Sequence, residues 1–103
     1  MTVVLAPKAR DDLDEIHAYI AADNPDAADL VQEAAFETFA ALDRTPGLGR
    51  LRRFSHPLLA DLRSFGVHCY PNYVIFHRIR ANCLEVARVL HGAQDLDAIL
   101  GDD

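Results

Sequence analysis

The sequence predicts an α+β domain with the element order β-α-α-β-β-β. Apolar residues recur at spacings of three and four between residues 9 and 42, which is the periodicity of a buried helix face. Three later segments and the first few residues are rich in β-branched and aromatic side chains, which favours strands. We therefore expect an N-terminal strand and a helical hairpin packed on a mostly antiparallel sheet.

The first half of the chain is predicted to be mainly helical. Residues 2–6 form a strand that ends before Pro7, which lacks an amide hydrogen and suits the first turn of a helix. We expect this helix to run to about Ala22, and its apolar stripe consists of Ala9, Leu13, Ile16 and Ile20. A second helix begins at Asn24-Pro25, where Asn24 can act as the N-cap. The short connection makes the two helices antiparallel.

The second half is predicted to supply the sheet. Residues 45–49 form a loop and residues 50–59 are expected to be irregular. Three strands follow, over residues 61–67, 72–79 and 83–90, the last two joined by a tight turn at Arg80-Ala81-Asn82. The continuous apolar run Val74-Ile75-Phe76 predicts a central strand buried on both faces. Residues 95–100 are expected to form a short C-terminal helical tail.

Charge is strongly segregated along a chain of 103 residues, which we interpret as a single domain. The net charge is −6, but residues 8–43 carry −8 and residues 44–91 carry +6, with arginine as the only cation in that second segment. A basic surface of arginines favours an acidic partner, whereas the negative total argues against strong non-specific nucleic-acid binding. No signal peptide or apolar run long enough for a membrane helix is present, so we expect a cytoplasmic protein with reduced cysteines.

Four regions of the sequence together form a recognisable pattern, namely Pro7–Ile16 with Tyr19-Ile20, Asn24–Ala28, Pro46–Arg50, and a last region that joins Leu62–Phe65, Tyr73–Arg78 and Arg88–Asp95. In this order and spacing they resemble the ParE branch of the ParE/RelE toxin superfamily. His17 stands where many members carry tryptophan, and Gln94 where arginine is usual. The resemblance implies a non-enzymatic type II toxin without cofactor. It also implies a ParD-like antitoxin with a ribbon-helix-helix DNA-binding domain that forms a hetero-oligomer with the toxin, and DNA gyrase as the target.

Two alternatives stay open at this point. One is a ribosome-dependent mRNA endoribonuclease of the RelE type, and the other is an inert member that only binds its antitoxin. RNA cleavage needs a base, a cation and an acid, for which the candidates are Arg63, Tyr70, Tyr73, Arg88 and His91. The acidic net charge, the absence of lysine from the basic half and the lack of tyrosine or histidine after His91 argue against this chemistry.

The candidate site residues fall into two groups. The arginines expected to bind the antitoxin are Arg50, Arg52, Arg53, Arg63, Arg78 and Arg88. The residues expected to bind the target are Arg88, His91, Leu96, Ile99 and Leu100. Arg63 and Arg88 have a purely structural alternative, which is pairing with Asp61, with Glu85 or with acids of the helices, and His91 has one in bonding the backbone at its turn.

The acidic helices and the cysteines and histidines are the remaining features of the sequence with a possible function. The acidic helices are interpreted either as a solvated face or as a surface for gyrase or for a second toxin. No cysteine or histidine spacing predicts a metal site.

Overall fold

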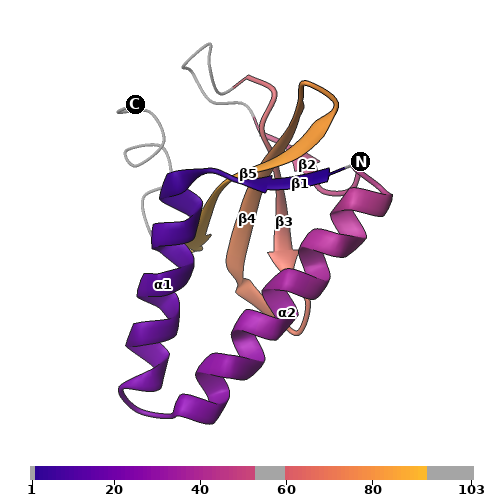
Figure 1. Cartoon of the computed structure of the whole chain (residues 1–103). Helices are drawn as coiled ribbons and strands as arrows, with labels where there is room; N and C mark the ends of the chain where they lie inside the picture. The colour runs from indigo at the N-terminus through magenta and orange to yellow at the C-terminus, as the bar shows by residue number, and fades with distance from the viewer. Residues whose placement is uncertain (1, 53–59, 93–103) are drawn as a thin grey trace.

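Two antiparallel helices lie against one face of a mixed sheet (Figure 1). The computed structural model describes residues 2–52 and 60–92. The elements of these residues are β1 (Thr2–Leu5), α1 (Pro7–Ala21), α2 (Pro25–Arg44), β2 (Arg50–Leu51), β3 (Arg63–Val67), β4 (Tyr70–Arg80) and β5 (Cys83–His91). The predicted α+β class is confirmed, and the predicted tail at residues 95–100 lies outside the described residues.

The strand order is β1-β5-β4-β3-β2. β1 runs parallel to β5, and every other pair is antiparallel. β4 is therefore the central strand, as the apolar run at residues 74–76 predicted. Ile75 belongs to the core beneath the helices and Phe76 to a smaller cluster on the opposite face, and both side chains are fully buried. We call that opposite side the second face of the sheet.

Both helices begin where the sequence predicted. Pro7 occupies the first turn of α1, and the Asn24 side chain accepts a hydrogen bond from the Ala27 amide at the start of α2. His17 Nε2 lies 2.9 Å from Asp29 Oδ1, an exposed contact between α1 and α2 across the hairpin.

The main core joins both helices to the sheet. Its buried members are Ala9, Ala34, Ala35, Phe39, Leu42, Val67, Ile75, Leu84, Val86 and Val89. The cluster on the second face consists of Leu62, Phe76 and Leu90. The alanines leave little side-chain volume between α2 and its neighbours, which permits close packing.

Three details differ from the sequence prediction. Arg50 and Leu51, expected to be irregular, form β2 because Gly49 adopts a φ of 94° and turns the chain alongside β3. β4 begins at Tyr70 because Cys69, with a φ of 67°, closes a tight turn after Val67. In the β4–β5 turn Ala81 as well as Asn82 has a positive φ. None of the described helices is long and apolar enough to cross a membrane.

Candidate interaction site

The site begins at the outer edge of β5. β1 accompanies this strand only as far as the Leu5–Val86 pair, and the Ala6 amide donates the last bond to the Val86 carbonyl at 3.0 Å. In the described part of the chain, no strand pairs with that edge of β5 beyond Val86. α1 passes over this stretch of the edge.

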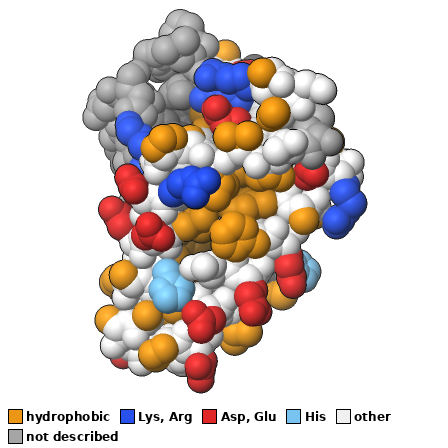
Figure 2. All heavy atoms as spheres, in the orientation of Figure 1, with side chains coloured by type: hydrophobic (Ala, Val, Ile, Leu, Met, Phe, Trp, Pro, Cys, Tyr) orange, Lys and Arg blue, Asp and Glu red, His pale blue; other side chains and the backbone are white. Residues whose placement is uncertain are grey.

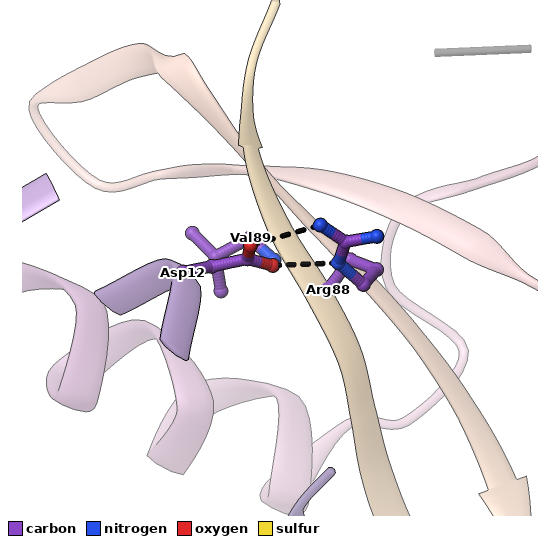
Figure 3. A network of polar contacts seen from close by, with 3 residues as sticks. All are labelled: Asp12, Arg88 and Val89. Carbon is purple, nitrogen blue, oxygen red and sulfur yellow. Dashed lines mark hydrogen bonds and ion pairs between the residues drawn. The ribbon is translucent and has the colours of Figure 1, made fainter. Parts of the chain in front are cut away.

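Asp12 of α1 closes the open edge (Figure 3). Its carboxylate accepts hydrogen bonds from Arg88 Nε at 2.8 Å, from Arg88 Nη2 at 3.0 Å and from the Val89 amide at 3.0 Å. Asp12 is 7% exposed, and the Arg88 side chain 16%. Bidentate, charge-assisted bonds of this kind are among the strongest polar contacts in proteins. We call this arrangement the Asp12 clamp; it ties α1 to the end of β5.

A groove of about 650 Å³ lies beside the Asp12 clamp, between α1 and the end of β5. Tyr19, which is 81% exposed, and Tyr73 contribute aromatic rings to its walls. The exposed His91 ring packs edge-to-face against Tyr73, with 5.4 Å between the ring centroids. The end of β5 thus presents an accessible aromatic surface.

Several arginines gather on the second face of the sheet. Arg50 pairs with Ser64 in the ladder, and Ser64 pairs with Phe76, so all three side chains share that face. The Arg52 guanidinium lies 5.9 Å from the Phe76 ring centroid and donates to Ser64 Oγ at 3.4 Å. Arg78 is bound by two carboxylates, Asp61 at 3.1 Å and Glu85 at 3.2 Å.

Arg63 lies elsewhere. In the β3–β4 ladder it pairs with His77, next to the Ser64–Phe76 pair. Successive side chains of a strand point to opposite faces, so the Arg63 side chain faces the helix side of the sheet. His77 is fully buried. Burial lowers the pKa of His77 below its ordinary value, and the nearby positive charge of Arg63 lowers it further. The histidine is therefore held in its neutral form.

Comparison with known proteins identifies the family. Residues 3–96 match the family model described as the ParE toxin of the type II toxin-antitoxin system parDE. The chain belongs to the ParE toxin family. It is thus the toxin component of a type II toxin–antitoxin system, as the resemblance predicted.

A chain from the chromosomal ParDE toxin–antitoxin system of P. aeruginosa shares the fold of this ParE toxin. The TM-score is 0.70 at 20% sequence identity, and the match covers 88% of this chain and 95% of that one. No curated protein matches the sequence.

The ribonuclease candidates of this ParE toxin do not come together as one group. Arg63 and Arg88 stand on strands separated by β4, with Arg63 on the helix side and the Arg88 guanidinium against α1 at the outer edge of β5. Tyr73 and His91 are in contact with each other at the groove. Tyr70 is the first residue of β4, where it pairs with Val67.

The remaining predicted residues are of two kinds. Arg53, Leu96, Ile99 and Leu100 lie outside the described residues. Cys69 and Cys83 are free cysteines, and no group of three potential metal ligands occurs within residues 2–52 and 60–92.

The residue that sequence reasoning missed is Asp12. Its signal was present, because Asp12 lies three residues after Ala9 and four before Ile16, on the apolar stripe of the helix. An acid on a stripe that packs against a sheet must find a partner there, since an unpaired buried carboxylate is costly.

Proposed function

We propose that this ParE toxin acts by binding rather than by catalysis. Its target is DNA gyrase, and a ParD-like antitoxin with a ribbon-helix-helix DNA-binding domain holds it inactive in the cytoplasm. The observation that carries the proposal is the Asp12 clamp, in which the guanidinium of Arg88 is bound on two nitrogens by a carboxylate of the same chain.

The clamp weighs against RNA cleavage for an electrostatic reason. A cation that stabilises a phosphorane has to meet the developing negative charge with donors that are not already neutralised. Arg88 directs two donors at Asp12, and Arg63 lies on the helix side of the sheet beside a neutral histidine. Neither arginine is placed to share one phosphate with the other.

We place the target contact at the end of β5. Here the clamp positions the strand, and His91, Tyr73 and Tyr19 offer a surface at the groove. Leu96, Ile99 and Leu100 follow shortly after His91 in the chain and are proposed to extend this contact. Aromatic side chains are enriched at the energetic centres of protein interfaces, which supports this assignment.

We place the antitoxin contact on the second face of the sheet. An acidic, amphipathic antitoxin segment would meet Arg50 and Arg52 there, with Arg53 following in sequence. Arg63, Arg78 and Arg88, the other arginines proposed for the antitoxin, are less favourably placed, because Arg63 faces the helix side of the sheet and the other two already bind acids of this chain. Exposed charges at such a face chiefly raise the association rate.

A gyrase cleavage assay tests the proposed activity. Purified toxin should convert supercoiled plasmid to linear DNA in the presence of gyrase and ATP, and excess antitoxin should prevent it. His91→Ala should weaken the effect, whereas His68→Ala, a matched change at another exposed histidine, should leave it intact. Cleavage of mRNA on translating ribosomes by the wild type, lost in Arg63→Ala, would overturn the proposal, as would activity in neither assay.

Stopped-flow association with the antitoxin tests the arginine surface. Arg50→Glu reverses an exposed charge on β2 and should slow association and reduce its dependence on salt. Lys8→Glu makes the same change on α1 and serves as the control. Equal association rates for the two variants would remove the second face as the docking surface.

A further inference from the structure

β1 is the last strand on its side of the sheet, and its main chain offers unused pairing groups. The Ala6 amide bonds inward to Val86, so by alternation Val4 also directs its amide and carbonyl toward β5. The corresponding groups of Val3 and Leu5 point outward, away from the sheet. No strand covers this edge in the described residues. Exposed edges of this kind readily pair with another strand.

An apolar groove runs alongside the same edge. It measures about 550 Å³ and is lined by Val3, Leu5, Phe36 and Phe39, among others. Phe36 is 47% exposed, and Val4, on the second face, is 44% exposed. Figure 2 shows the apolar patch between the helices, with basic and acidic side chains at its margins. Apolar area next to an open strand edge is typical of an interface.

The charges at the two ends of the groove have opposite signs. Arg10 lies in the first turn of α1, just beyond the C-terminal end of β1. Asp43 lies in the last turn of α2, which ends near the N-terminal end of β1 (Figure 1). The groove is therefore positive at one end of β1 and negative at the other.

We propose that a second copy of this chain docks on this edge, with the two β1 strands antiparallel about a two-fold axis. An antiparallel arrangement places Arg10 of each copy beside Asp43 of the other, so that one surface complements itself, as a two-fold interface requires. Val3 pairs with Leu5 of the second copy, and the two Val4 side chains meet on the second face. The sheet then continues through both subunits.

Charge reversal tests the pairing in solution with the toxin alone, so the outcome is independent of the gyrase proposal. Sedimentation equilibrium of the wild type should show a concentration-dependent dimer. Arg10→Glu and Asp43→Arg each create two like-charged contacts per dimer and should weaken association by about tenfold or more. A 1:1 mixture of the two variants should associate more tightly than either alone, because both contacts in the mixed dimer join opposite charges, one as in the wild type and the other with the two charges exchanged.

Glu33→Arg supplies the control, since it makes a comparable charge change on an exposed position of α2 outside the groove and should preserve the dimer. Circular dichroism of each variant establishes that the fold is retained. A wild type that stays monomeric throughout the concentration range overturns the proposal. This outcome covers the case in which the β1 edge pairs with a strand of the antitoxin, so that the variants weaken only antitoxin binding. A dimer that both reversals leave unchanged, or a mixture no tighter than its components, overturns it equally.

Discussion

Replacing Asp12 with alanine should strongly destabilise the toxin. The substitution leaves the Arg88 guanidinium without its carboxylate and the Val89 amide without its acceptor, both in a buried or nearly buried setting. Removing one partner of a buried pair costs about 3–5 kcal/mol. Because the Arg88 side chain retains some exposure, we expect the lower end, about 3 kcal/mol. That is a large share of the roughly 5–15 kcal/mol that holds a domain folded.

Urea unfolding followed by circular dichroism measures the effect. A loss of about 3 kcal/mol corresponds to a fall in Tm of roughly 12 °C or more for a domain of this size. Asp14→Ala, at an exposed position of the same helix, should change the free energy of unfolding by no more than about 0.5 kcal/mol. The double variant Asp12→Ala/Arg88→Met should be less destabilised than the two single changes added together. If the free energy of unfolding of Asp12→Ala lies within about 1 kcal/mol of the wild-type value, the Asp12 clamp does not stabilise the fold as argued.

Three other substitutions test the local structure. Gly49→Ala should cost about 2 kcal/mol or more of unfolding free energy, since its φ is 94° and the added Cβ would lie 2.6 Å from a backbone oxygen, whereas Gly47→Ala meets no atom within 4 Å and should be nearly neutral. Because the pKa of His77 is lowered in the folded state, the unfolded chain binds the proton first as the pH falls, and the free energy of unfolding should decrease below about pH 6.5. Urea titrations at several pH values should show a smaller decrease for His77→Phe than for the wild type. Ala81→Gly should raise the free energy of unfolding by up to about 1 kcal/mol, because Ala81 has a φ of 52°, and an unchanged or lower value would contradict the strain.

The elements that the sequence predicted well are those with local causes. Pro7 and Asn24-Pro25 mark helix starts through their own backbone and side-chain chemistry, so both starts were found. The apolar run at residues 74–76 indicates a strand that is buried on both faces, and this inference does not require knowledge of the neighbouring strands. β2 was missed because its two residues have no strand pattern of their own and are ordered by β3 and by the turn at Gly49.

The candidate site was predicted less completely, because it depends on contacts between distant parts of the chain. Asp12 and Arg88 are 76 residues apart, and only the fold places α1 against the end of β5. The sequence left Arg88 open between a direct role and an ion pair with a helix acid, and the structure supplies that ion pair. Strand alternation likewise places Arg50 and Arg63, which belong to one basic segment of the sequence, on opposite faces of the sheet.

The separation of the two proposed contacts limits how an antitoxin can neutralise this toxin. Arg50 lies on β2 and His91 on β5, three strand spacings apart, or roughly 15 Å across the sheet. An antitoxin that blocks the target contact by covering it must therefore extend across β3 and β4 and also pass round the edge of the sheet, because Tyr73 and His91 lie on its helix side. That path takes at least about ten helical residues or about five extended ones. A shorter acidic peptide should bind near β2 and leave gyrase poisoning intact, and a longer one should suppress it. Suppression by the short peptide, measured in the same cleavage assay, would mean that the two contacts overlap or communicate through the sheet.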